Sequence, residues 1–291
     1  ENPGTLDGTD WPHHRMLGDV SMRVMMLDLV DLYGTGSVDV VVAEERTGVV
    51  VLEAPSGDKT QTWSATHLRC DESSIEIGTT VMIVPYRNPL ETARSLTNID
   101  HLSGGRLIFG VGIGWAEEEF AALKLPFRRR GAMTNEFLAA IKTLWTEESA
   151  SFNGKYASFS DVSTAPLPLR KPHPPIWVGG SSDAAMRRTV RLGDAWPPIR
   201  FDENWLRNEG IPRLRQIADE EGGEMPALCP RIRLRIFDSL LDDSRTMGNG
   251  TLDQIRGDLA SLEELGCEHV LLDTYYDEVE VTRDPAPAFR T

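Results

Sequence analysis

From residue 75 onward, short apolar runs alternate with longer stretches of helical periodicity. The apolar runs are Ile75–Val84, Arg106–Val111, Ile176–Val178, Asp194–Pro197, Arg231–Phe237 and His269–Asp273. The helical stretches between them are Pro89–Leu102, Asn135–Trp145, Ser182–Leu192, Trp205–Glu220 and Leu252–Leu265. Strands and helices that alternate at this spacing predict βα units built around a parallel sheet.

The stretch Leu96–Trp115 is the most informative of these units. Asn88 supplies an N-cap before a proline at the first helical position, and two glycines end the helix. The strand that follows is apolar throughout, as expected for a parallel strand buried on both faces. Its C-terminal end carries alternating glycines at positions where a side chain would block a flat ligand or a close backbone approach: Gly110, Gly112 and Gly114.

Two blocks of the sequence resemble the bacterial luciferase-like flavin and deazaflavin oxidoreductases, and within them the branch that uses coenzyme F420. The first block is SLTNIDHLSGGRLIFGVGIGWAEEEF, which continues through PFRRRG. The second is LWTEESASFNGKYASFSDVSTAPLPLRKPHPPIWVGGSSDAAMRRTVRLGDAW. The resemblance is close over residues 75–196 and loose over the rest of the chain.

The resemblance implies an α/β fold of the (β/α)8 TIM-barrel type, as a single domain over residues 1–291. Residues 149–175 interrupt the rhythm with several prolines, and we expect an excursion that contains a small hairpin. Residues 1–73 match poorly: Ser37–Ala43 predicts a strand and Val20–Tyr33 a helix before it, without a convincing first strand. The C-terminal RDPAPAFRT is too rich in proline for a closing helix. We therefore expect a barrel with atypical chain ends.

Composition narrows the classes of partner. The formal net charge of −15 argues against nucleic acid and anionic membranes. The 3 cysteines are far apart and form no Cys/His cluster, so we expect no metal site and a reducing compartment. No signal peptide and no apolar run of about 18 residues is present. These features predict a soluble, cytoplasmic protein with a small-molecule substrate, and a homodimer is the candidate assembly.

Residues 178–183 run from a strand through two glycines into a helix start. Backbone N–H groups freed by glycine, together with the helix N-terminus, predict a cradle for an anion. An ordinary βα turn capped by Ser182 is the alternative interpretation. The resemblance implies that this loop holds the phosphate of the coenzyme, through Gly179, Gly180, Ser181 and Ser182.

The strand from Ile75 is the second candidate for cofactor binding. In the resembled family this strand carries a bulge, often with a non-proline cis peptide, against which the flavin-like ring lies. The resemblance therefore implies ring contacts from Thr79, Thr80 and Val81, with Gly112 on the next strand. Threonine at position 80, where the family usually has glycine, makes the backbone less permissive. A buried β-branched strand without a ligand is the alternative.

Two tryptophans and two glutamates are candidates for the substrate side. Trp115 at a strand tip could stack on the substrate pocket, and Trp196 matches another pocket position of the family. Glu118 begins a helix, where the dipole favours an acidic residue in any case. Glu45 stands where many relatives have a histidine, and a desolvated carboxylate there could transfer a proton. A solvated Glu45 paired with Arg46 is the alternative.

The function that the resemblance implies is hydride transfer between coenzyme F420 and a small organic substrate, with Glu45 and Glu118 as candidate catalytic residues. Two alternatives remain. A luciferase-type monooxygenase would use FMN and oxygen on the same barrel. A cofactor-free, non-catalytic barrel is favoured by the departures from the family at both chain ends.

Overall fold

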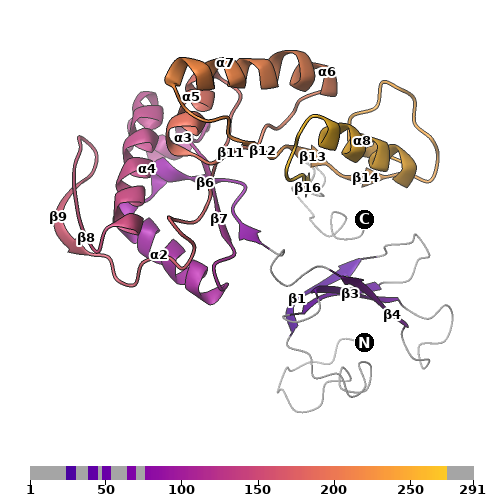
Figure 1. Ribbon diagram of the computed structural model, residues 1–291, viewed down its shortest axis with the longest axis horizontal. Coiled ribbons are helices and arrows are strands. Elements are labelled where there is room, and N and C mark those ends of the chain that lie inside the picture. The colour runs from indigo at the N-terminus through magenta and orange to yellow at the C-terminus, as the bar shows by residue number, and fades with distance from the viewer. Residues whose placement is uncertain (1–23, 31–38, 45–47, 54–63, 70–75, 274–291) are drawn as a thin grey trace, which may run out of the picture. The chain divides into compact units, whose positions relative to one another are not determined.

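The computed structural model describes residues 24–30, 39–44, 48–53, 64–69 and 76–273 of the 291-residue chain. The chain divides into two units, Glu1–Ile75 with Tyr275–Thr291, and Glu76–Thr274. Figure 1 shows the second unit, in magenta to yellow, as strands with helices packed beside them. None of the described helices is long and apolar enough to cross a bilayer.

The described part of the first unit is one antiparallel sheet with strand order β1-β2-β3-β4. Its strands are β1 (Val24–Val30), β2 (Asp39–Glu44), β3 (Gly48–Glu53) and β4 (Ser64–Arg69). The strand predicted at Ser37–Ala43 is confirmed by β2. The helix predicted over Val20–Tyr33 is wrong, because β1 pairs with β2 along its length. Periodicity alone cannot tell so short an apolar run from a buried helix.

A parallel sheet with strand order β12-β11-β10-β7-β5 forms the core of the second unit, and β6 also pairs with β7. All these pairings are parallel, as the alternation of strands and helices predicts. The strands are β5 (Ile77–Gly78), β6 (Met82–Ile83), β7 (Leu107–Gly112), β10 (Ile176–Val178), β11 (Ala195–Trp196) and β12 (Ala227–Leu228).

Two further short strands follow β12 along the chain, β13 (Arg231–Arg233) and β14 (Arg235–Ile236). β13 pairs in parallel with β16 (Leu271–Asp273), and β14 pairs in parallel with β15 (Asn249–Gly250). A bridge between Leu228 and Cys267 extends the β13–β16 pairing back to β12. The order of strands is that of a TIM-type barrel, and the described strands do not close into a ring.

Helices follow the strands as predicted. The main helices are α2 (Pro89–Leu102), α4 (Arg130–Thr146), α5 (Asp183–Leu192), α7 (Ile211–Glu221) and α8 (Leu252–Glu264). Side-chain caps explain where α2, α5 and α8 begin. The shorter segments are η2 (Val84–Tyr86), α3 (Glu117–Ala122), η3 (Phe127–Arg129), α6 (Glu203–Trp205) and the π-helical η4 (Leu206–Gly210). Asn88 caps α2 and Ser182 caps α5, because each side chain accepts a hydrogen bond from the first turn.

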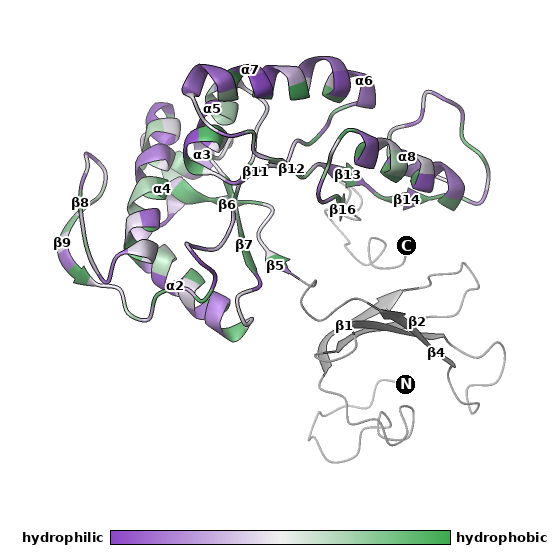
Figure 2. Cartoon of the chain, viewed as in Figure 1, coloured by the Kyte–Doolittle hydropathy of each residue, from purple (hydrophilic) through white to green (hydrophobic). Residues whose placement is uncertain are grey.

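The two faces of the parallel sheet have different contents. One face packs against α2 and α4 and buries large apolar side chains, among them Phe109, Val111, Ile176 and Val178. The opposite face carries a smaller cluster of Ile108, Trp177, Ala195 and Cys229. Figure 2 shows hydrophobic colour along β6 and β7 and a hydrophilic side on most helices. Each large side chain that is fully buried contributes about 1.5–3 kcal/mol to the free energy of unfolding. The face covered by α2 and α4 therefore contributes more to stability than the opposite face.

The predicted excursion at residues 149–175 contains the expected hairpin, β8 (Ser149–Asn153) paired with β9 (Ser158–Ser163). The chain then returns to the sheet over α2. Asp100 of α2 is fully buried, and its Oδ2 accepts hydrogen bonds from the backbone N–H groups of Leu169 at 2.7 Å and Arg170 at 3.1 Å. Asp100 therefore ties the returning segment to the helix, together with His101, whose Nε2 lies 2.8 Å from the Leu167 carbonyl oxygen.

A buried arginine joins α4 to α5. Arg188 is 5% exposed, and its Nε donates to Asn135 Oδ1 at 2.5 Å while Nη2 donates to the Gly131 carbonyl oxygen at 3.3 Å. Burial lowers the pKa of this guanidinium. Both acceptors are neutral, and none of the described carboxylates forms an ion pair with Arg188. The free-energy cost of removing this charge from water is therefore only partly compensated by its hydrogen bonds.

The substitution Asn135→Asp should raise the free energy of unfolding, because it gives the buried guanidinium a charged acceptor at the same position. We expect a gain of about 1 kcal/mol, the difference between a charge-assisted and a neutral hydrogen bond. Urea denaturation at neutral pH measures it. Asn208→Asp is the matched control, since it adds the same charge at an exposed position and should change the free energy by less than about 0.5 kcal/mol. Equal effects of the two substitutions would contradict the prediction.

Candidate functional site

The strand predicted over Ile75–Val84 is interrupted by a bulge. Gly78 lies opposite Ile108 of β7, and Met82 lies opposite Val111. Three residues separate Gly78 from Met82, whereas two separate Ile108 from Val111, so this strand contains one extra residue. The residues between are Thr79, Thr80 and Val81, and the peptide bond between Thr80 and Val81 is cis. The continuous strand is thus a wrong prediction, because one extra residue cannot enter the ladder. The bulge and the cis bond that the resemblance implied are both present.

The glycines of β7 make room for this bulge. A Cβ at Gly110 would overlap the carbonyl oxygen of Thr79, and Thr79 Oγ1 donates to the Gly110 carbonyl oxygen at 2.7 Å. A Cβ at Gly112 would lie 2.6 Å from Val81 Cγ2. Of the two interpretations of the glycine pattern, a flat ligand or a close approach, the second applies at these positions. Gly112 itself is buried beneath Val81.

Val81 forms an exposed apolar surface beside the ends of β7 and β10, immediately before β6 begins. Its side chain lies over Gly112, and its Cγ1 would be 3.6 Å from a Cβ at Gly179. The residue remains 40% exposed. An exposed valine held from below by two glycines presents a flat, rigid patch, and we call this patch of Val81, Gly112 and Gly179 the floor. Carboxyl ends of parallel strands are the usual position of active sites in barrels.

The loop Gly179–Ser182 lies beside the floor and leads into α5. The Gly179 N–H donates to the Val111 carbonyl oxygen at 2.9 Å, which anchors the loop to β7. Ser182 Oγ accepts from the Ala185 N–H at 3.3 Å and so serves as the cap. The N–H groups of Gly180, Ser181 and Ser182 find no acceptor among the described residues, and all three residues are exposed. Exposed N–H groups at a helix N-terminus can receive an anion.

The two predicted pocket tryptophans lie in different environments. Trp115 follows β7 and is 84% exposed, so its indole is available at the rim of the site. Trp196 is fully buried against Trp205, with ring centroids 6.2 Å apart. Its Nε1 donates to the Gly180 carbonyl oxygen at 2.8 Å. Trp196 therefore supports the glycine loop from within the core and presents no surface to a substrate.

Of the two predicted glutamates, only Glu118 belongs to the described residues, and it forms no hydrogen bond or ion pair with the floor among them. Glu118 is exposed in the first turn of α3. Its neighbour Glu119 accepts a hydrogen bond from the Tyr86 hydroxyl at 2.7 Å. Burial raises the pKa of Tyr86 to about 12, with contributions from the hydrogen bond to Glu119 and from the charges of Glu119 and Glu118. Glu45 lies outside the described residues.

Arg231 is a site residue that the sequence reasoning missed. Its Nη1 donates to the Thr80 carbonyl oxygen at 3.2 Å, and its Nη2 to Asp273 Oδ2 at 2.5 Å. Alternate residues of a strand share one face. The sequence does contain a signal for this residue. Arginine occupies every second position of an otherwise apolar strand, at Arg231, Arg233 and Arg235.

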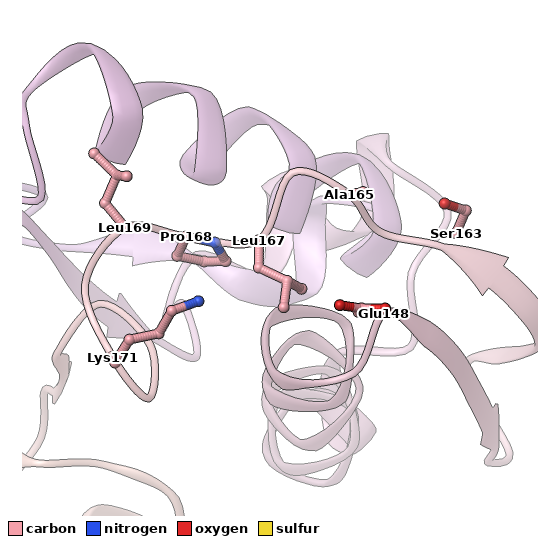
Figure 3. A pocket seen from close by; sticks show the side chains of 7 residues that line it. All are labelled: Glu148, Ser163, Ala165, Leu167, Pro168, Leu169 and Lys171. Carbon is pink, nitrogen blue, oxygen red and sulfur yellow. The ribbon is translucent and has the colours of Figure 1, made fainter.

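A separate hollow of about 550 Å³ lies by the excursion and not at the floor. Figure 3 shows Glu148 and Lys171 on opposite sides of it, with Leu167 between them. The other lining residues are Ser163, Ala165, Pro168 and Leu169. The Leu169 N–H binds Asp100, near the end of α2 that precedes β7, so the hollow lies at the N-terminal end of the strand and the floor at its C-terminal end. None of the predicted site residues lines this hollow.

No group of three or more His, Cys, Asp or Glu side chains in the part of the chain that the structure describes is arranged to hold a metal ion. The site thus offers an apolar floor, free N–H donors and one arginine–aspartate pair. This donor set suits an organic ligand with an apolar ring and an anionic group.

Comparison with known proteins places these features in a family. The profile of the luciferase-like monooxygenases matches residues 63–245. An uncharacterized protein of Mycobacterium tuberculosis is 34% identical over 125 residues, which are 43% of this chain and 44% of that protein. The FMNH2-dependent dimethylsulfone monooxygenase of Pseudomonas putida is 38% identical over 110 residues, 37% of this chain and 30% of that protein. The chain thus spans less than half the length of either relative.

A solved structure shares the fold. It is an F420-dependent secondary alcohol dehydrogenase in complex with an F420–acetone adduct, and the TM-score is 0.59 at 17% identity. The likeness covers 75% of this chain and 80% of that one. At this identity the comparison supports a luciferase-like fold of the TIM-barrel type.

The substitutions Gly110→Ala and Gly179→Ala should have opposite outcomes, although each adds one methyl group to the same face. At Gly110 the methyl would overlap the Thr79 backbone, and we expect a loss of about 3 kcal/mol or more in the free energy of unfolding. At Gly179 it would meet the Val111 oxygen at 3.4 Å and Val81 Cγ1 at 3.6 Å, both ordinary contacts. Denaturant unfolding of the two variants measures the difference, and comparable stability would contradict the packing of the bulge.

Removing the negative charge of the acceptor by Glu119→Gln should lower the pKa of Tyr86 from about 12 toward its usual range. Ultraviolet difference titration follows the tyrosinate, and Tyr86→Phe identifies its signal. Because the folded chain keeps this proton where the unfolded chain releases it, the contribution to stability is complete below about pH 10 and is lost as pH rises toward 12. Glu118→Gln is the matched control and should give the smaller shift; the reverse order would contradict the assignment.

Proposed function

The chain belongs to the luciferase-like monooxygenase family, and on this premise we propose that it is an oxidoreductase that transfers a hydride between coenzyme F420 and a small organic substrate. The observation that carries the proposal is the floor of Val81, Gly112 and Gly179 beside exposed N–H groups of the next loop. An apolar surface next to an anion cradle is the pair of features that a ring with a phosphate tail requires.

The floor suits a planar ring because backbone contacts fix the position of the Val81 side chain. Thr79 is held against Gly110 on one side, and Val81 lies on Gly112 and Gly179 on the other. A side chain at Gly112 would displace Val81, because its Cβ would lie 2.6 Å from Val81 Cγ2. The ring of a flavin or deazaflavin would bury the exposed part of Val81, at about 25 cal/mol for each Å² of apolar surface removed from water.

The phosphate tail fits the loop that follows β10. Gly180 has a φ of 113°, a conformation that favours glycine, and this turns its carbonyl oxygen to the Trp196 indole. The N–H groups of Gly180, Ser181 and Ser182 are left at the N-terminus of α5, a helix of 10 residues. The dipole of that helix favours an anion here.

The chemistry of a bound F420 would be hydride transfer at a ring carbon. The residues of this chain would position the substrate over the floor and exclude water, and Trp115 at the rim would wall the pocket. We assign proton handling to Glu118 and to Glu45 as candidates. A carboxylate that carries a proton would come within about 2.6–3.2 Å of the reacting atom, or act through one water.

A second candidate is an FMN-dependent monooxygenase. It is favoured by the 38% identity to the dimethylsulfone monooxygenase of Pseudomonas putida, whose name specifies FMNH2. The floor and the loop would serve FMN as they serve F420, because the two cofactors share a tricyclic ring and a phosphate. The cofactor therefore has to be decided by binding.

Titration of the purified chain with F420 and with FMN, followed by fluorescence quenching, tests the proposal. Tight binding of F420 with weak binding of FMN is the expected result, the reverse would indicate the monooxygenase, and binding of neither would indicate a cofactor-free barrel. Gly179→Val should weaken binding at least tenfold, about 1.4 kcal/mol, because its methyl groups would extend over the floor. Gly257→Val on α8, where the added Cβ meets nothing within 4 Å, is the control and should bind like the unmodified chain.

A further inference from the structure

An arginine–aspartate pair connects the last strands of the sheet to the bulge. Arg231 of β13 and Asp273 of β16 form an ion pair of 2.5 Å, and their side chains are 29% and 17% exposed. The other guanidinium nitrogen donates to Thr80, which lies 151 residues earlier in the sequence. One side chain therefore contacts two segments that are remote from each other along the chain.

The pair lies on β13 and β16, beyond the apolar cluster to which Cys229 and Leu271 belong. Cys229 and Leu271 belong to the apolar cluster on the face away from α2 and α4. Arg231 and Asp273 are each two residues further along the same strands, and Arg231 pairs with Leu271 in the parallel register. Because side chains two apart share a face, the charged pair forms the next layer above this cluster, toward the carboxyl ends of the strands.

The arginine also lies next to the floor. The Thr80 carbonyl oxygen that it binds belongs to the same peptide group as the backbone nitrogen of Val81. The guanidinium is thus one hydrogen bond away from the peptide group that carries the exposed valine. Thr80 is itself exposed, so the positive charge stands at the edge of the open site.

We propose that Arg231 is a positioning residue that orients the Thr80 carbonyl and places a positive charge beside the floor, so that the site binds a reduced flavin ring more tightly than the oxidised flavin ring. The inference rests on the proposed function, since it concerns the ring-binding site. Asp273 opposes the effect by compensating part of the charge. Arg231 therefore favours binding of the reduced ring, and Asp273 disfavours it.

The physical reason is the different charge of the two forms of the ring. At mildly alkaline pH a reduced flavin carries a negative charge on the ring that the oxidised form lacks. A nearby cation lowers the free energy of that anion, whereas a neutral ring gains little. By thermodynamic linkage, the ratio of the two dissociation constants reports this difference and the shift in reduction potential together.

The test compares the dissociation constants of oxidised and reduced FMN under anaerobic conditions. Arg231→Met should weaken binding of the reduced form about tenfold more than that of the oxidised form. Asp273→Asn removes the opposing charge and should shift the ratio toward the reduced form. Arg231→Lys keeps the charge and should restore most of the original ratio.

The opposite signs separate an electrostatic role from a structural one. Loss of packing would weaken binding of both ring forms equally in either variant, and that result overturns the inference. If Arg231→Met does not fold, as judged by circular dichroism, Asp273→Asn alone decides, and an unchanged ratio or one shifted toward the oxidised form overturns it. Binding of neither FMN nor F420 by the unmodified chain overturns the proposed function as well, whereas failure to bind FMN alone, or FMN binding with unaltered ratios, overturns only the role of Arg231.

Discussion

The approach of the Thr79 backbone to Gly110 is the contact on which the site depends. An extra residue between β5 and β6 needs space that a parallel sheet does not ordinarily provide, and the absence of a side chain at position 110 supplies it. Once Thr79 is bound there, Val81 is directed over Gly112 and Gly179, and the Thr80 carbonyl is within reach of Arg231. The position of Val81 on the floor and the hydrogen bond between Arg231 and Thr80 both depend on this one approach.

Much of the second unit follows from local signals in the sequence. Asn88, Ser182 and Thr251 begin their helices as capping chemistry predicts, and the parallel order follows from the alternation of strands and helices. The helix predicted from Asn135 begins at Arg130, because PFRRRG has no side-chain cap to mark its start. The β1 strand could not be recognised, since its identity depends on pairing with β2 rather than on its own periodicity.

The site was predictable to the extent that local backbone chemistry defines it. Glycine spacing indicated a close approach on β7 and an anion loop after β10, and the family resemblance supplied the bulge. The role of Trp196 was not predictable, because family position marks it as a pocket residue and only packing against Trp205 shows that it is buried. Arg231 was missed because it acts on a carbonyl from a distant part of the chain, and no short motif encodes such a contact.

The bond from the Trp196 indole to the Gly180 carbonyl has a consequence for how this protein can change. Trp196 is part of a core cluster that includes Leu206, Ile211 and Leu214 from η4 and α7. The shape of the Gly179–Ser182 loop is therefore set in part by the packing of η4 and α7 around Trp196. Substitutions in this core cluster can move the Gly180 carbonyl and the loop that carries it. The affinity of the site for a ligand can therefore change although every residue exposed at the site stays the same.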